Sequence, residues 1–426
     1  MQKSPADATE CHYSSELERW DRKLHAFVDL GTPQIAAPSS DAGSDTGRDR
    51  GSLSNITVGV KDIIDVAGMP TRNGSETCSG AAAAEADATV VAALRRAGAR
   101  IIGKTTTTEF AFTDPTDCRN PYDLDRSPGG SSSGSGAAVA AGMVDIALGT
   151  QTAGSLCRPA AYCGAVGFKP SYGVLPTTGV TPLAPSFDTV GVIARTVALA
   201  ERAFYAMRPG AGSGISADKK GITTTTLLLD ATTEVAPETM EALQEADESL
   251  RRAGPRTQPP DLKMDMADVV ADHRTVMNYE AFQAHGHLLM DDRKSLLKPK
   301  FRAGLELGSG VSGAEMEAAL ERLAGARQNF WRLMTGVDAI LTLPVPEGAP
   351  PIGGTTGFQD WLTPWTVFGG PLVCLPWGLD ALGRPRSVML AGRPGEDARL
   401  LTIAKTLEGD APRLPLPDLP LPDLPA

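Results

Sequence analysis

The stretch from residue 127 to residue 170 constrains the fold and the chemistry of this chain more than any other. It contains two clusters rich in serine and glycine, GGSSSGSG at residues 129–136 and TAGS at residues 152–155, separated by an apolar run. The run predicts a helix over residues 136–142 and a strand over residues 144–149. A flexible linker followed by a turn is the simpler interpretation, but a linker does not run directly into a packed helix and strand. Serines held at two such turns are what a serine nucleophile and a proton-relay partner require.

A phosphate-binding loop is the other interpretation of the first cluster. The cluster contains no lysine, and it matches neither G-x-x-x-x-G-K-[ST] nor G-x-G-x-x-G. Both nucleotide-binding hypotheses are therefore weak.

The composition bounds the class of protein. The chain has 426 residues and a formal net charge of −11, which argues against an electrostatic partner such as nucleic acid or an anionic membrane. The N-terminus has no apolar signal-peptide core, and no apolar run reaches the roughly 18 residues of a membrane span, so we expect a cytoplasmic protein. The six cysteines include no C-x-x-C pair, and His285 and His287 lack a third ligand nearby, so we expect free thiols, no metal and no cofactor.

Alternating helical and strand patterns predict an α/β fold. We expect helices over residues 16–30, 87–97, 136–142, 190–205, 237–253, 265–288, 312–334 and 397–407. We expect strands over residues 56–64, 99–103, 144–149, 224–229, 338–343 and 371–376. We predict a single domain over residues 1–410, in which the polar residues 37–54 form a mobile loop. Residues 411–426 repeat LPLPD and predict an extended, proline-rich tail.

Ser155 lies in the TAGS turn, directly after a predicted strand. Such a turn can present a hydroxyl together with free backbone N–H groups that stabilise an oxyanion. A serine hydroxyl needs a base, and no histidine lies between His25 and His273, although a distant one could assemble in space. A lysine serves if burial keeps it neutral, and Lys61 in the β-branched strand 56–64 is a candidate. The local pattern alone slightly favours the alternative, that Lys61 lies at a solvated strand end.

Several ordered motifs of this chain resemble the amidase signature family of Ser–Ser–Lys hydrolases. They are GVKDIIDVAGMPT at residues 59–71, SPGGSSSGSGAAVAAG at 127–142, LGTQTAGSLCRPAAYCGAVGFKPSYG at 148–173, LPWG at 375–378 and AGRPGEDARLL at 391–401. The resemblance spans residues 20–407. It implies a large mixed, mostly parallel β-sheet core that is covered by helices on both faces.

The resemblance also implies the site residues. Ser155 is similar to the acyl-accepting nucleophile, Ser131 to the bridging serine that follows an unusual cis peptide bond, and Lys61 to the base. The family's oxyanion hole corresponds to the backbone N–H groups of Thr152, Ala153, Gly154 and Ser155. For substrate binding we name Phe110, Ala111 and Phe112, with ordinary packing as the alternative.

The implied activity is that of an amidohydrolase, a hydrolase acting on carbon–nitrogen bonds of linear amides other than peptide bonds. It cleaves a small amide through a Ser155 acyl-enzyme, while Ser131 relays protons to Lys61. The alternative is an amidotransferase A-type subunit that works with partner subunits, and the third hypothesis is a non-catalytic member that keeps the fold. The expected partner is a small-molecule amide, and a homodimer is left open.

The chain departs from the family pattern T-D-x-G-G-S-x-R at three positions. Gln151 replaces the aspartate, Ala153 replaces a glycine, and Arg158 lies three residues after the serine rather than two. None of these changes removes Lys61 or either serine, so we expect activity to survive. The changes weaken any transfer of substrate preference from the family to this chain.

Overall fold

The computed structural model describes residues 17–31, 52–210, 222–229, 233–260, 262, 264–290 and 292–418. Residues 37–51 of the predicted mobile loop and the end of the proline-rich tail lie outside the described residues. The described part of the tail, residues 411–418, forms neither helix nor strand, and the Tyr122 hydroxyl donates a hydrogen bond to the Pro415 carbonyl. The division of the chain into one domain and a tail stays a prediction.

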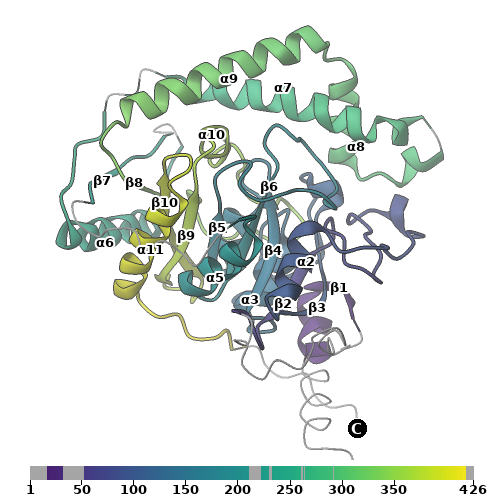
Figure 1. Ribbon diagram of the computed structural model, residues 1–426, viewed down its shortest axis with the longest axis horizontal. Coiled ribbons are helices and arrows are strands. Elements are labelled where there is room, and N and C mark those ends of the chain that lie inside the picture. The colour runs from purple at the N-terminus through teal and green to yellow at the C-terminus, as the bar shows by residue number, and fades with distance from the viewer. Residues whose placement is uncertain are drawn as a thin grey trace, which may run out of the picture.

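Ten strands form one sheet in the order β1-β3-β2-β4-β6-β5-β9-β10-β8-β7 among the described residues (Figure 1). The strands are β1 (Phe27–Leu30), β2 (Thr57–Lys61), β3 (Arg100–Thr105), β4 (Ile146–Gln151), β5 (Val166–Lys169), β6 (Thr189–Ala194), β7 (Thr224–Thr226), β8 (Ala339–Thr342), β9 (Leu372–Leu379) and β10 (Pro385–Gly392). The α/β class and the large mixed sheet are confirmed.

The expectation of a mostly parallel sheet is wrong. Within the described chain, only the β3–β2, β2–β4 and β8–β7 pairs are parallel, and the other six neighbouring pairs are antiparallel. The helix–strand alternation predicts crossover connections between neighbours, but β6 inserts between β4 and β5 and pairs antiparallel with both. In addition, β9 and β10 form a hairpin, a short connection that is available only to antiparallel strands.

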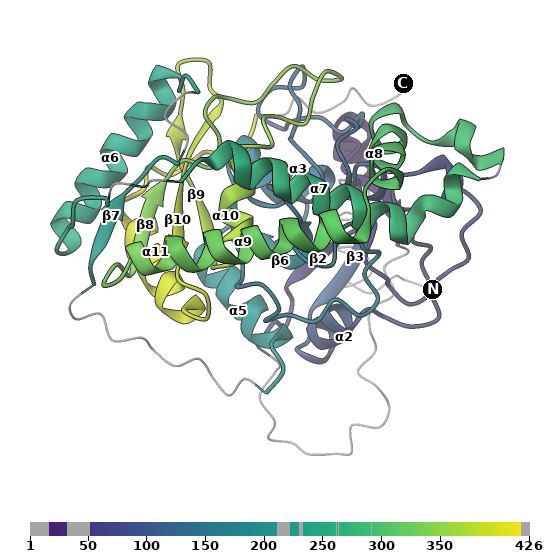
Figure 2. The same ribbon diagram turned by 90° about the horizontal axis from the view of Figure 1, so that it is seen from above.

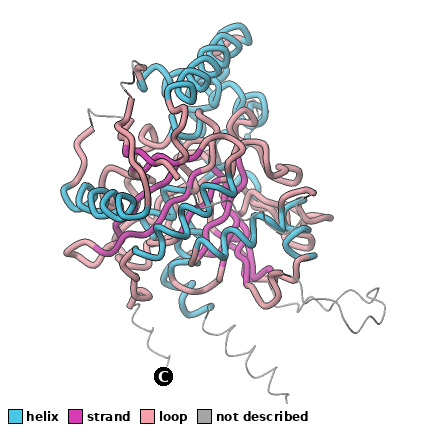
Figure 3. The backbone as a smooth tube through the Cα atoms, turned by 60° about the vertical axis from the view of Figure 1, so that its left-hand side comes forward, coloured by secondary structure: helices cyan, strands magenta, loops and turns pink. Residues whose placement is uncertain are grey.

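Helices lie on both faces of the sheet, as the tube in Figure 3 shows. They are α2 (Thr89–Arg96), α3 (Ser133–Ala140), α4 (Cys157–Cys163), α5 (Val197–Met207), α6 (Pro237–Ala253), α7 (Met266–His285), α8 (Pro299–Ser309), α9 (Gly313–Leu333), α10 (Thr363–Val367) and α11 (Asp397–Asp410). On one face of the sheet, α5 packs between α2 and α11. On the other face, α3 and α4 pack together. Helices α7, α8 and α9, here called the roof, cross above the strands, and α7 packs against both α8 and α9 (Figures 1 and 2). Among the described residues, no helix is both long enough and apolar enough to cross a bilayer.

Two predicted helices are partly strands. Residues 17–24 are helical, but Phe27–Leu30 forms the edge strand β1. Residues 190–194 belong to β6, and α5 begins only at Val197. Residues 27–30 continue the helical spacing of the apolar residues before them, and residues 190–194 are a short apolar run in which periodicity cannot separate a buried strand from a helix. The capping box of Ser312 and Glu315, which the spacing predicts, is present at the start of α9.

The glycines of the GGSSSGSG cluster allow close packing rather than flexibility. Helix α3, which carries the second half of the cluster, is buried throughout. A Cβ on Gly134 would lie 2.0 Å from the Ala26 carbonyl oxygen and 2.4 Å from the Thr106 backbone nitrogen. Any side chain at this position would push α3 away from the backbone beneath it, so glycine is required here for close packing. The linker interpretation is therefore wrong, because the cluster is part of the packed core.

The pairing of β2 with β4 positions the site. These strands are parallel neighbours, with Val60 opposite Leu148. Their carboxyl ends therefore meet at one edge of the sheet. Lys61 is the last residue of β2, and Thr150 and Gln151 end β4, so the TAGS turn emerges beside the lysine.

Candidate active site

Lys61 is fully buried and faces the GGSSSGSG cluster. Its Nζ lies 2.6 Å from Ser131 Oγ and 2.8 Å from Thr150 Oγ1. Burial lowers the pKa of Lys61 to about 7, while Asp188 opposes this shift and Arg158 adds to it. The solvated alternative for Lys61 is wrong, and a large share of the lysine is neutral near pH 7.

This arrangement predicts the pH profile. If Lys61 must be neutral to accept a proton, kcat/KM should rise with pH through a midpoint near 7 and reach a plateau above it. A solvated lysine would place the midpoint near 10.4, its approximate ordinary pKa. Steady-state rates from about pH 5 to 10 in buffers of constant ionic strength would measure it. A profile without a rising limb near neutrality would contradict Lys61 as the base.

Ser131 is held by its backbone as well as by the lysine. The Gly130–Ser131 peptide bond is cis, as the family resemblance implies. The Arg158 guanidinium donates to the Gly130 carbonyl at 2.6 Å, and the Thr108 N–H donates to the Ser131 carbonyl at 3.2 Å. The Ser131 hydroxyl is thereby directed at Lys61 Nζ, where a relay serine would have to be.

Ser155 lies beside Ser131, since the N–H of Ser132 donates to the Ser155 carbonyl at 3.2 Å. Within the described residues, no hydrogen bond joins the hydroxyls of Ser155 and Ser131. Catalytic hydrogen bonds often tighten only when substrate is bound, so the last step of the relay stays a prediction.

The carbonyl groups of the TAGS turn are all occupied. His273 Nε2 lies 2.8 Å from the Thr152 carbonyl, the Thr366 hydroxyl donates to the Ala153 carbonyl, and the N–H of Arg158 donates to the Gly154 carbonyl at 3.0 Å. Burial lowers the pKa of His273 to about 4, so its ring is neutral and donates through Nε2. The N–H groups of Ala153, Gly154 and Ser155, by contrast, have no acceptor among the described residues. Successive N–H groups left free in a turn form an anion-binding concavity, which is what an oxyanion hole requires.

Gln151, which replaces the family aspartate, makes hydrogen bonds that hold the oxyanion turn. Its Oε1 accepts the N–H groups of Leu156 and Cys157 at 3.2 and 3.0 Å. Its Nε2 donates to Thr366 Oγ1 at 3.0 Å, and Thr366 in turn holds the Ala153 carbonyl. A carboxylate could accept the two N–H groups but could not donate to Thr366.

The three residues named for substrate binding are buried. The ring centroid of Phe110 lies 4.5 Å from that of His285 and 4.8 Å from that of Phe301, and Phe112 also contacts Phe301. These two rings thus pack between the 3₁₀ turn Glu109–Ala111 and the roof. Ala111 borders a small cavity that Thr150 and Thr152 also line. A role of these residues in substrate binding stays a prediction.

Several residues that shape the site are assigned no role from the sequence. They are Thr150, Arg158, Asp188, His273 and Thr366. Thr150 and Arg158 lie in the motif that resembles the family pattern. Asp188, His273 and Thr366 lie far along the chain from the turn they hold.

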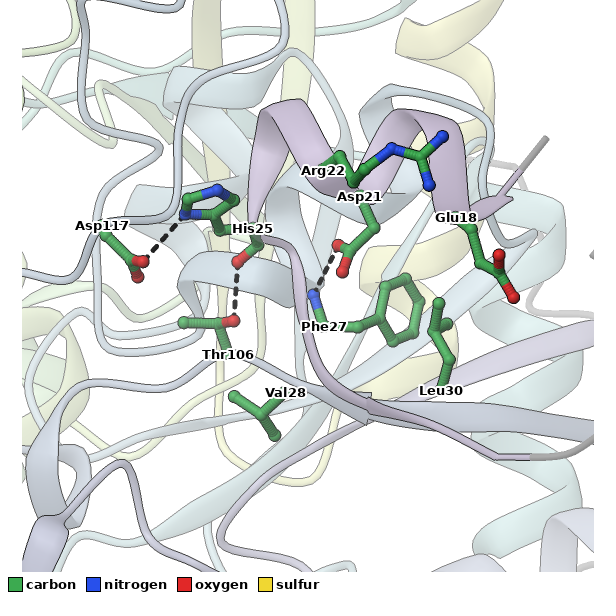
Figure 4. Close-up of a pocket in the computed structure, with 9 residues that line it drawn as sticks. All are labelled: Glu18, Asp21, Arg22, His25, Phe27, Val28, Leu30, Thr106 and Asp117. Atoms are coloured by element: carbon green, nitrogen blue, oxygen red, sulfur yellow. Dashed lines mark hydrogen bonds and ion pairs between the residues drawn. The ribbon is translucent and has the colours of Figure 1, made fainter. Parts of the chain in front are cut away.

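A second pocket lies apart from the triad, beside β1 (Figure 4). There the His25 ring contacts Asp117 at 2.8 Å, and Asp21 accepts the N–H of Phe27 at 2.8 Å. These contacts fix the chain between the first helix and β1, and the charged side chains of Glu18 and Arg22 also line the pocket. Within the described residues, no three His, Cys, Asp or Glu side chains are grouped to hold a metal ion.

A comparison with known protein families identifies the family of this chain. The family model for amidases matches residues 11–401. The chain belongs to the amidase signature family. It is an amidase-family hydrolase with the amidase-signature fold, as its motifs imply.

Individual relatives in the amidase signature family have different names. The A-type subunit of the glutamyl-tRNA(Gln) amidotransferase of Anaeromyxobacter dehalogenans is 31% identical over 469 residues, covering 95% of this chain and 92% of that protein. The peptide amidase from Stenotrophomonas maltophilia has a TM-score of 0.79 and 26% identity, covering 97% of this chain and 98% of that one. A chain from a vestigial protein complex that reveals the origins of an s-triazine catabolic enzyme has a TM-score of 0.84 and 26% identity, covering 97% of both chains. The amidase signature therefore narrows the reaction to amide chemistry and leaves the substrate to be determined.

Proposed function

We propose that this chain cleaves the C–N bond of an amide through an acyl-enzyme on Ser155, with Ser131 as the relay and Lys61 as the base. The contact that carries the proposal is the 2.6 Å hydrogen bond between the buried Lys61 Nζ and Ser131 Oγ. A buried amine that titrates near neutrality has the right proton affinity for a general base at physiological pH.

The proposed first half-reaction transfers one proton in two steps. Neutral Lys61 accepts the proton of Ser131, and Ser131 accepts the proton of Ser155 as its Oγ attacks the amide carbonyl. The N–H groups of residues 152–155 stabilise the resulting oxyanion. The same relay returns the proton to the leaving nitrogen, which departs as ammonia or an amine.

In the second half-reaction, water attacks the ester that joins the acyl group to Ser155. Lys61 again accepts a proton through Ser131, and the carboxylic acid leaves as Ser155 regains its hydrogen. The base thus acts twice in each cycle, and it starts and ends as a neutral amine.

The released ammonia can have either of two fates. A stand-alone hydrolase of small linear amides releases it to solvent, and this is the first hypothesis from the sequence. An amidotransferase A-type subunit takes the amide of glutamine and passes ammonia to a charged tRNA with partner subunits. The names of the curated relatives favour this second candidate. Both candidates use the same Ser155 acyl-enzyme.

Two measurements test the proposal and separate the candidates. A fluorophosphonate probe followed by peptide mass mapping should label Ser155, and labelling elsewhere or nowhere would refute the acyl-enzyme. Ammonia release should then be measured with glutamine and with a panel of aliphatic, aryl and amino-acid amides. Robust turnover of the panel without preference for glutamine selects the stand-alone hydrolase. Turnover confined to glutamine selects the amidotransferase component.

A further inference from the structure

Asp188 contacts the oxyanion turn from outside the triad. It lies at the start of β6, and its Oδ1 accepts the hydroxyl of Thr152 at 2.5 Å. Its Oδ2 accepts the N–H groups of Leu183 and Ala184 at 2.8 and 3.0 Å. Three donors pointed at one carboxyl group favour its ionised form, although burial raises its pKa. The Asp188 carboxyl group, which can carry a negative charge, therefore holds Thr152 of the oxyanion turn.

The same carboxylate faces the surroundings of Lys61. Asp188, Thr152 and Thr150 line one small cavity, and Thr150 is hydrogen-bonded to Lys61 Nζ. The cavity has a volume of about 10 Å³, close to the minimum that a single water molecule needs. The small volume leaves little room for solvent beside Asp188, so its charge is weakly screened on the side of Thr150 and Lys61.

Few other charged groups act on this pair. Arg158 of α4 opposes the effect of Asp188 on Lys61. Glu280 of α7 raises the pKa of Asp188, and Glu280 is itself held by the N–H and hydroxyl of Ser186. Asp188 in turn raises the pKa of Tyr172. His273, on the other side of Thr152, is neutral. Asp188 is the carboxylate that acts most directly on the lysine.

We propose that Asp188 is a positioning residue of this active site, which fixes the oxyanion turn through the Thr152 hydroxyl and sets the pH range in which Lys61 acts as a base. This inference rests on the proposed function, since it assumes that Lys61 and Ser155 perform the chemistry. It assigns two separable effects to one side chain. The hydrogen bond governs the maximal rate, and the charge governs the pH midpoint.

Two substitutions separate the effects. In Asp188→Asn the amide oxygen can keep both backbone N–H groups and the amide nitrogen can donate to Thr152, so the charge is lost while the contacts remain. Without that charge the ammonium form of Lys61 is less favoured, the pKa of Lys61 falls, and the pH midpoint should move down by about one unit. Thr152→Val removes the hydrogen bond and keeps the charge. It should lower the plateau rate about tenfold with the midpoint unchanged, and Thr152→Ser should restore the plateau.

The readout is the second-order rate of Ser155 labelling by a fluorophosphonate probe between about pH 5 and 10, which requires no known substrate. Asp397→Asn is the matched control, because Asp397 likewise accepts a backbone N–H and a hydroxyl, both from Ser171. It should leave the midpoint in place.

An Asp188→Asn midpoint equal to that of the wild type would overturn the electrostatic role. A Thr152→Val plateau equal to that of Thr152→Ser would overturn the positioning role, and this pair decides that role even if Asp188→Asn does not fold. Failure of the wild type to label at Ser155 would refute the proposed function itself and this inference with it.

Discussion

Ser155→Ala is expected to lower kcat/KM by about 10⁴-fold or more and to abolish fluorophosphonate labelling. The substitution removes the only atom that the proposed mechanism bonds covalently to substrate, and loss of a serine nucleophile costs several orders of magnitude in serine hydrolases. Ser155 is nearly buried, and its hydroxyl makes no side-chain hydrogen bond among the described residues, so the variant should fold normally. Amide turnover and the melting temperature should be measured on the same preparation.

Ser133→Ala provides the matched control for this experiment. Ser133 is also buried in the serine-rich stretch, but its hydroxyl donates to the Gly129 carbonyl at 2.7 Å and contacts neither Lys61 nor Ser155. Its activity should stay within about tenfold of the wild type, in line with the loss of one structural hydrogen bond. Substantial turnover by Ser155→Ala would disprove the acyl-enzyme, whatever Ser133→Ala does.

Lys61→Met is expected to have the second-largest effect, a loss of about 10³-fold or more in kcat/KM across the pH range. Methionine fills a similar volume but can neither accept a proton nor hold Ser131. The residual activity should lose the rising limb near pH 7, because the group that produces the limb is gone. Pre-steady-state labelling of Ser155 would show whether acylation itself is slowed.

The same variant should show that Lys61 costs stability. The pKa of Lys61 is about 7 in the folded protein, against 10.5 for an ordinary lysine, so between these pH values the unfolded chain binds one proton more. The stability contribution of Lys61 therefore improves as pH rises through this window. Relative to the wild type, Lys61→Met should be most stable below pH 7 and should lose that advantage towards pH 10, as thermal unfolding at pH 6 and 9 would show.

Lys169→Met separates the catalytic effect from that of any buried lysine. Lys169 is fully buried, its pKa is lowered by burial to about 8, and its Nζ donates to the carbonyls of Pro170 and Gly370 at 2.8 Å each. Its replacement strands two carbonyl groups and should destabilise the protein while leaving the pH midpoint unchanged. Equal losses of kcat/KM in both lysine variants would argue that Lys61 is merely structural.

The resemblance to the family motifs points to Lys61, Ser131 and Ser155 together, whereas the residues alone indicate Ser155 in its turn and offer Lys61 only as a candidate. The cis bond before Ser131 follows from the same resemblance, and the capping box of Ser312 follows from the spacing of Ser312 and Glu315. The type of an element could be predicted where a helical pattern of apolar residues extends over many residues, as in α6 and α9. The prediction failed at residues 190–194, a short apolar run that fits a strand and a helix equally well, and at residues 27–30, which continue the helical spacing of the residues before them.

Local sequence patterns could not predict which strands are antiparallel neighbours. They also could not predict which residues hold the oxyanion turn. Thr366 and His273 lie 213 and 121 residues from the carbonyl groups they hold. No local pattern marks a histidine that donates to a carbonyl on another element, and the identity of that carbonyl depends on how the roof docks. Strand order is likewise decided by which faces pack together, and that information is distributed over the whole chain.

The attachment of the roof to the oxyanion turn through His273 has a consequence for protein engineering. All three proposed reacting side chains lie between residues 61 and 155, so exchanging α7–α9 with those of a relative looks like a safe way to redirect substrate choice. Such a chimera would, however, also replace the donor to the Thr152 carbonyl. Grafts that keep a neutral histidine at position 273 should give active hybrids more often than grafts that match the roof surface alone.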